Sequence, residues 1–191
     1  MQESEITSWG GSPLISFADD GDLVLLVGPE AVKIRVHSLF LTKASKPFKA
    51  MLGPDWKEGH DIVSSKGPAE ISLPDDDAPS LKAICAILHH QSDTVSQSLS
   101  AVKVLRIAVV ADKYDWTKAM TLISSGWLKV RENKPRDLML LAAAAYLFRN
   151  AEAFKATTKA MVLNHGSSFL ELSSEEVESA MPWKVICESY R

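Results

Sequence analysis

The hydrophobic period of this sequence changes at His37, and that change limits what the chain can fold into. Before it, residues 22–27 (DLVLLV) form a continuous apolar run, and residues 32–36 (VKIRV) alternate apolar with basic residues. Both patterns are typical of β-strands. A Gly-Pro-Glu segment joins the two runs, so we expect a β-hairpin that carries Lys33 and Arg35 on its solvent-exposed face.

From His37 onward, apolar residues recur at steps of three and four, which predicts helix. Pro47 interrupts this stretch, and a proline inside one continuous helix would remove a backbone hydrogen bond. We therefore expect two short helices, with Pro47 in the first turn of the second helix. Ser45 is placed to cap that helix, because a serine hydroxyl accepts a hydrogen bond from an otherwise unpaired amide.

A third strand is predicted at residues 69–73 (AEISL), which alternate at period two. The acidic run Asp75–Asp77 then precedes the apolar stripe of residues 81–90 (LKAICAILHH), with Pro79 in between. This order is typical of a helix start. A divalent-cation site is the alternative, but the run lacks the alternating ligands and central glycine of a calcium loop, so we favour helix capping.

The remainder of the chain is predicted to be helical. Amphipathic or apolar stripes indicate helices at residues 101–114, 116–130, 135–148 and 151–163. Trp116 and Trp127 lie on one apolar stripe, and we interpret both as structural. Ser173 and Glu176 form a plausible capping box, and Pro182 is expected to open a last short helix.

Composition excludes several classes of partner. The chain has 191 residues, a formal charge of −3 and only two cysteines, Cys85 and Cys187. The negative charge disfavours nucleic acid and anionic membranes as partners. The longest apolar run, residues 138–148, is too short to span a bilayer. The two cysteines lie far apart and the N-terminus is polar, so we expect a reducing compartment, the cytosol or the nucleus.

Reactive groups are few. Cys85 and His89 lie four residues apart on one helix face, as two metal ligands would, with His90 and Asp93 nearby. Because Cys85 also lies on the apolar stripe, we favour a buried cysteine beside partly exposed histidines. A metal-dependent enzyme is a remote alternative. We found no nucleophile-elbow, zinc-protease or nucleotide-binding motif, so we predict no catalytic residue, metal or cofactor.

Two sequence features indicate residues that could contact a partner at the protein surface. Lys43, Lys46 and Lys49 recur every three residues, which usually marks a solvated helix face and less often a docking site for an acidic partner. Trp56 stands among polar and turn-forming residues (GPDWKEGHD), where periodicity gives no reason for burial. Docking to a partner and local loop packing are equally compatible with that position.

Five residues carry a resemblance to a known family. An Asp precedes the first strand, and His, Leu, Ser and Phe follow at offsets of zero, four, eight and eleven; these residues are Asp22, His37, Leu41, Ser45 and Phe48. This spacing resembles that of the BTB/POZ domain. Residues 71–90 and 104–116 also look like later parts of the domain. The HH pair at 89–90, together with VADKYDW, is similar to BTB proteins of filamentous fungi.

The resemblance covers about residues 20–130 and implies an α+β fold. We expect a small three-stranded mixed sheet flanked by a cluster of helices, forming a BTB/POZ domain over residues 22–130. Residues 1–21 would form a flexible arm, and residues 131–191 an all-helical C-terminal extension. In this setting we expect the His37 imidazole to be largely buried and bonded to backbone or to a nearby carboxylate such as Asp22.

The resemblance implies a non-enzymatic protein-interaction module that self-associates as a homodimer. Some BTB proteins are adaptors that dock onto the cullin scaffold of a ubiquitin ligase through a hydrophobic-x-Glu motif after the second helix, and here Trp56-Lys57-Glu58 stands at that place. The predicted partner-binding residues are Met51, Leu52, Asp55, Trp56 and Glu58. The alternative is a transcription-linked BTB protein that acts through co-repressor partners.

Overall fold

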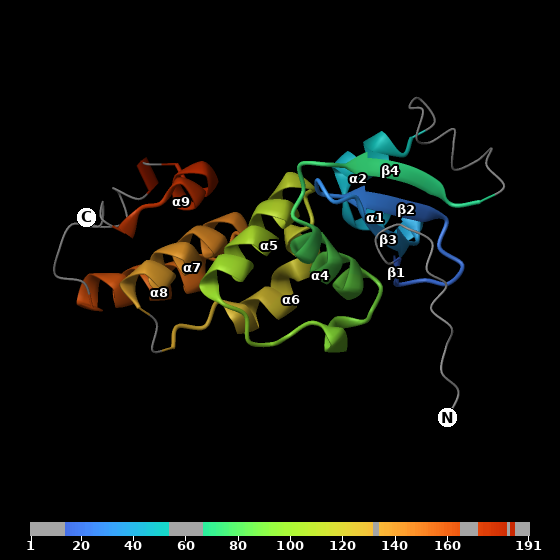
Figure 1. Cartoon of the computed structure of the whole chain (residues 1–191). Helices are drawn as coiled ribbons and strands as arrows, with labels where there is room; N and C mark the ends of the chain where they lie inside the picture. The colour runs from blue at the N-terminus through green and yellow to red at the C-terminus, as the bar shows by residue number, and fades with distance from the viewer. Residues whose placement is uncertain (1–13, 54–66, 132–133, 165–171, 183, 186–191) are drawn as a thin grey trace.

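The computed structural model describes residues 14–53, 67–131, 134–164, 172–182 and 184–185. Figure 1 shows a small sheet with α1 and α2 at one end of the molecule, α7, α8 and α9 at the other, and α4, α5 and α6 between them. The fold is therefore mixed α+β, as expected from the change of hydrophobic period.

The hairpin lies where the sequence predicts it. Strands β2 (Leu23–Val27) and β3 (Val32–Val36) pair antiparallel, and β4 (Ala69–Leu73) pairs parallel with β2. Strand β2 is central and has four of its five residues buried, which explains its continuous apolar run. Strand β4 pairs on one side only within the described sheet, and its residues alternate between buried and exposed.

The described sheet has four strands, in the order β1-β3-β2-β4, rather than the predicted three. The additional strand, β1 (Ile15–Ser16), pairs parallel with β3 and lies within the segment predicted to be a flexible arm. The backbone amide of Phe17 extends this pairing by donating to the Arg35 carbonyl at 3.0 Å. Two residues are too few to produce a readable period, so the pattern could not indicate this strand.

The chain segment that leads into β2 requires glycine at position 21. A Cβ at this position would lie 2.6 Å from the carbonyl oxygen of Val36, closer than any side chain tolerates. Glycine therefore allows the chain to pass against the end of β3 before β2 begins.

The predicted break at Ser45 is confirmed. Helices α1 (Ser38–Ala44) and α2 (Lys46–Met51) are separated at Ser45, whose hydroxyl accepts the Phe48 amide at 3.0 Å. Pro47 lies in the first turn of α2, where its missing amide proton costs no intrahelical bond.

The middle helices begin with α4 (Ala78–Leu88), which is capped by Asp77, and a short 3-10 helix, η1 (Ser92–Thr94), follows it. The Asp77 carboxylate accepts the Ser80 amide at 2.9 Å and the Ser80 hydroxyl at 2.6 Å, so helix capping is confirmed for this residue. Helices α5 (Ala101–Lys113) and α6 (Thr117–Trp127) follow close to the predicted bounds.

The C-terminal helices share a core with the middle helices. Helix α7 (Pro135–Leu147) packs against α5, α8 (Ala151–Asn164) and α9 (Glu175–Ala180). It is buried without interruption from Leu138 to Ala145, which explains why its sequence is apolar throughout. None of the helices in the described part of the chain is both long and apolar enough to cross a membrane.

The predicted capping box before α9 is wrong. The N-cap is Ser174, and its side chain makes no capping bond. The Ser173 hydroxyl instead donates to Glu178 at 2.9 Å, and Glu176 lies 3.4 Å from Arg106 on α5. Glu176 cannot complete the box because it points toward another helix. Most of the last predicted helix lies outside the described residues.

Three helices end in the same left-handed turn, and none of the three uses glycine. His90, Asp115 and Arg149 have φ angles of 60°, 56° and 57° and follow the C-caps of α4, α5 and α7. At each end the next amide reaches five residues back, as from Trp116 to the Ala111 carbonyl at 2.7 Å. These are Schellman motifs, in which glycine is the usual residue at the left-handed position.

Candidate functional site

The five signature residues gather where the hairpin passes into α1 and α2. Leu41, Ser45 and Phe48 are buried, the first and last completely. Asp22 caps α1 from outside the helix: its carboxylate accepts the Ser38 amide at 2.7 Å and the Ser38 hydroxyl at 2.6 Å. Burial alone would raise the pKa of Asp22, but the hydrogen bonds from Ser38, together with smaller contributions from the Asp22 backbone and His37, outweigh it and lower the pKa.

His37 takes a more exposed position than expected. Its side chain is 31% exposed, and Nε2 lies 3.0 Å from Oδ1 of Asp20 rather than beside Asp22. The prediction of a largely buried imidazole is therefore wrong, although the expected contact with a carboxylate exists. The carboxylate of Asp22 is already engaged by Ser38, which explains why the ring turns to Asp20.

His89 is buried, whereas the sequence predicts a partly exposed ring. It is 8% exposed, and its Nε2 accepts the backbone amide of His37 at 3.0 Å. Its Nδ1 lies 2.8 Å from the Cys85 carbonyl. Because the first nitrogen must accept and the second must donate, the ring is neutral with its proton on Nδ1. Burial is the main cause that lowers the pKa of His89.

His89 is unsuited to the metal role that its spacing to Cys85 suggested. Both ring nitrogens already bond to backbone, and the Cys85 thiol is completely buried. Burial raises the pKa of this thiol to about 12, far from the thiolate that binds metal. Among the residues that the structure describes, no three His, Cys, Asp or Glu side chains form a group that could hold a metal ion.

Asp76, in the acidic run, has a role that the sequence did not reveal. It is 6% exposed and accepts the Tyr114 hydroxyl at 2.5 Å, while its other oxygen lies 2.7 Å from Nζ of Lys113. This network ties the turn before α4 to the end of α5. Burial and the adjacent carboxylate raise the pKa of Tyr114, so its hydroxyl stays protonated and donates.

An aromatic cluster lies beneath the Asp76 network. The rings of Phe48, Tyr114 and Trp116 have centroids separated by 4.8 to 5.0 Å. Such aromatic contacts contribute about 0.5–1.5 kcal/mol per pair beyond their burial. The signature residue Phe48 thereby joins α2 to the end of α5, and the structural interpretation of Trp116 is confirmed by its complete burial.

The predicted partner-binding residues are only partly described. Met51 ends α2 and Leu52 is its C-cap, and both are half-buried. Asp55, Trp56 and Glu58 lie outside the described residues, so their role stays a prediction.

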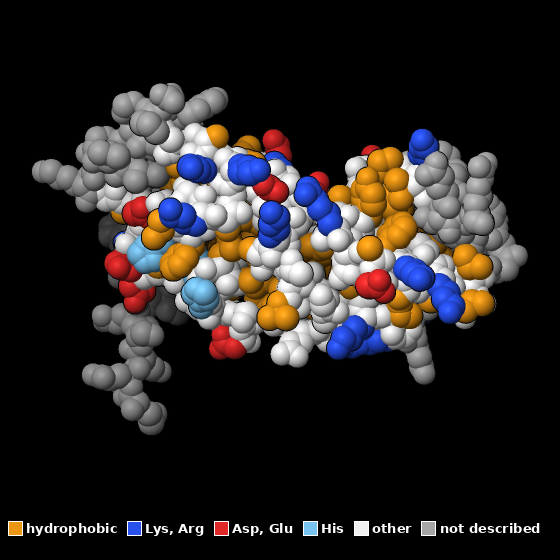
Figure 2. All heavy atoms as spheres, turned by 180° about the vertical axis from the view of Figure 1, so that it is seen from behind, with side chains coloured by type: hydrophobic (Ala, Val, Ile, Leu, Met, Phe, Trp, Pro, Cys, Tyr) orange, Lys and Arg blue, Asp and Glu red, His pale blue; other side chains and the backbone are white. Residues whose placement is uncertain are grey.

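Exposed lysines lie on α1 and α2. Lys43 is on α1, whereas Lys46 and Lys49 are on α2, so the predicted stripe is divided between two helices; docking to an acidic partner stays a prediction. Seen from behind, several Lys and Arg side chains gather over the end of the molecule that carries the sheet (Figure 2). Histidine side chains lie beside hydrophobic ones at the same end. His90 is exposed, and its ring lies edge-on to that of Phe40 with the centroids 5.9 Å apart.

Comparison with known proteins gives no assignment. No protein-family model matches the chain, and no curated protein matches it.

Proposed function

We propose that this chain is a BTB/POZ-type protein-interaction module that self-associates and acts as an adaptor docking onto a cullin scaffold of a ubiquitin ligase. The observation that carries the proposal is the use of all five signature residues at one corner of the fold. Asp22 and Ser45 cap α1 and α2, Leu41 and Phe48 fill the core, and His37 joins the hairpin to α4 through its backbone amide.

The polar groups that most resembled a reactive site support a non-enzymatic role. His89 bonds to two backbone groups, Cys85 is sealed in the core, and Asp77 caps a helix. Each of these groups therefore has a structural role, either as a hydrogen-bond partner of the backbone or as part of the core. We place the protein in the cytosol or the nucleus.

The C-terminal helices support the adaptor role in particular. Cullin-binding members of the family that the sequence resembles place an additional helix pair after the domain. Here α7 and α8 follow the corresponding segment; α7 packs on α5, and α8 packs on α7. Residues of α2, α7 and α8 belong to one hydrophobic core. A partner could therefore contact the end of α2 and this helix pair as two parts of one packed unit.

A pull-down with the purified amino-terminal region of a cullin tests the docking proposal. The full chain should retain the cullin, and replacing Trp56 and Glu58 with alanine should abolish retention, because an apolar anchor and a carboxylate are lost together. Lys57→Ala, in the same loop, is the matched control and should retain binding. Circular dichroism should show equal helicity in all three proteins. Retention by the double variant would overturn the choice of this loop.

Self-association is tested separately by light scattering on the chain alone. We expect the mass of two 20.9 kDa chains, and the mass of a single chain at every concentration would contradict the proposal.

A further inference from the structure

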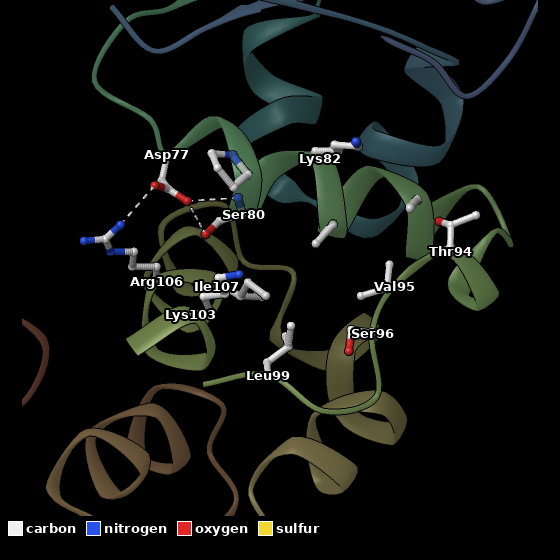
Figure 3. A pocket seen from close by; sticks show the side chains of 13 residues that line it. Asp77, Ser80, Lys82, Thr94, Val95, Ser96, Leu99, Lys103, Arg106 and Ile107 are labelled. Atoms are coloured by element: carbon white, nitrogen blue, oxygen red, sulfur yellow. Dashed lines mark hydrogen bonds and ion pairs between the residues drawn. The ribbon is translucent and has the colours of Figure 1, made fainter. Parts of the chain in front are cut away.

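A hollow lies between α4, α5 and the segment that joins them. Its volume is about 280 Å³, and Figure 3 shows Val95 and Leu99 of the joining segment pointing into the space beside α4. We call this hollow the α4–α5 cleft. It shares no residue with the predicted cullin-binding loop.

The floor of the α4–α5 cleft is apolar and held in place. Small side chains of α4 and a branched side chain of α5 form it together with the joining segment; these residues are Ala83, Ala86, Ile107, Val95 and Leu99. The joining segment is fixed to α6, because Nε1 of Trp127 donates to the Ser96 carbonyl at 3.1 Å. The cleft is therefore formed before any partner binds.

The rim is cationic although the chain as a whole is anionic. Lys82, Lys103 and Arg106 line the cleft with Asp77 as the only carboxylate, giving the lining a formal charge of +2 against −3 for the chain. Arg106 lies 3.9 Å from Asp77 and 3.4 Å from Glu176. For the exposed Lys82 and Lys103 the described part of the chain provides no ion pair, so both ammonium groups are available to a carboxylate from outside.

The size and the lining of the cleft suit a short protein segment. Small-molecule and cofactor sites usually measure about 300–1,000 Å³ and enclose most of their ligand. At about 280 Å³ this cleft is at the lower end of that range, which is room for one or two large side chains. Apolar side chains with neighbouring carboxylates would fill the floor and pair with the two lysines.

We propose that the α4–α5 cleft binds a short acidic segment of a partner protein, in which one or two aliphatic or aromatic side chains are flanked by carboxylates. The apolar floor supplies the anchor site, and Lys82 and Lys103 select the flanking charge. This surface goes beyond the proposed cullin contact, and its test uses no cullin, so the two proposals can fail independently.

The test is a selection from a random peptide library displayed on phage, with the full chain immobilised. We expect enrichment of peptides that combine acidic residues with Leu, Ile, Phe or Trp. The most enriched peptide is then labelled, and its affinity is measured by fluorescence anisotropy against the chain and three variants.

The variants separate the two parts of the recognition. Lys82→Glu with Lys103→Glu reverses the rim charge and should weaken binding at least tenfold, more strongly at low salt. Ala83→Trp fills the floor and should also abolish binding. The matched control reverses Lys155 and Lys159, two exposed lysines of α8, and should leave affinity unchanged within about twofold.

Three results would overturn the proposal. The first is a selection that enriches no peptide, or only peptides without carboxylates. The second is binding that survives both the lysine reversal and Ala83→Trp in variants that circular dichroism shows to be folded. The third is loss of self-association in Ala83→Trp with no peptide enriched, which would assign the cleft to a second copy of this chain.

Discussion

The backbone amide of His37 donates to Nε2 of His89 at 3.0 Å, and this bond joins the start of α1 to the end of α4. The opposite nitrogen of the same ring bonds to the Cys85 carbonyl at 2.8 Å. One neutral imidazole therefore satisfies a backbone group within its own helix and a second one at His37, 52 residues away in the sequence.

Acid should destabilise the protein through His89. The folded state lowers the pKa of this ring, chiefly by burial, so the unfolded chain binds the proton more readily. The stabilising contribution is present above the unfolded pKa of about 6.5 and is lost as pH falls below it. Urea unfolding at several pH values should show the free energy of unfolding declining in this window.

The variant His89→Ala provides the control for this pH effect. It should lose about 2 kcal/mol at neutral pH, because a buried amide and a buried carbonyl lose their partner. Its stability should also depend less on pH between 7 and 5 than that of the natural chain. An unchanged pH dependence would assign the effect to other groups of the chain.

Removal of the Asp76 carboxylate should cost more than removal of its lysine partner. Asp76→Ala leaves the buried Tyr114 hydroxyl without an acceptor, and we expect a loss of about 2–3 kcal/mol. Lys113 is about half exposed, so Lys113→Ala should cost less than about 1 kcal/mol. Chemical denaturation of the two variants checks this order, and equal losses would show that the ion pair outweighs the tyrosine bond.

Glycine at the left-handed end of α5 should stabilise the protein. Asp115 has a φ of 56°, and the left-handed conformation costs a residue with a Cβ about 1 kcal/mol. Asp115→Gly should therefore raise the melting temperature, with a gain of up to about 1 kcal/mol. Asp112→Gly, in the helix itself, should have the opposite sign, because glycine is a poor helix former. A loss in both variants would contradict the conformational argument.

Loss of the Ser45 cap should weaken α2. Ser45→Ala removes the acceptor of the Phe48 amide in a buried setting, and we expect a loss of about 1–2 kcal/mol. Thr42→Ala, on the neighbouring helix, removes a hydroxyl whose bond is to a carbonyl of the preceding turn. Its effect on the thermal midpoint should be small, and a larger effect than that of Ser45→Ala would count against the cap.

Local features of the fold could be predicted from the sequence. The three main strands follow from period and composition, and Ser45, Pro47 and Asp77 mark helix starts through chemistry that acts within a few residues. Features that join distant segments could not be predicted. The partners of His89 and Asp76 become visible only when α1, α4 and α5 are assembled.

The three left-handed helix ends were missed for a related reason. Their usual marker is glycine, and the chain uses His90, Asp115 and Arg149 instead. The candidate site could also be predicted only in part. The signature residues were named because their spacing resembles that of a known family. The α4–α5 cleft could not be predicted, because the two helices and the loop that line it share no sequence period.

We propose that this chain works by binding other proteins, a cullin among them. The decisive experiment is affinity purification of the tagged full chain from cells that express it, followed by mass spectrometry. We expect a cullin to co-purify with the natural chain and to be lost when Trp56 and Glu58 are both replaced with alanine. Purification without any cullin would contradict the adaptor role, and recovery of a co-repressor in its place would favour the transcription-linked alternative.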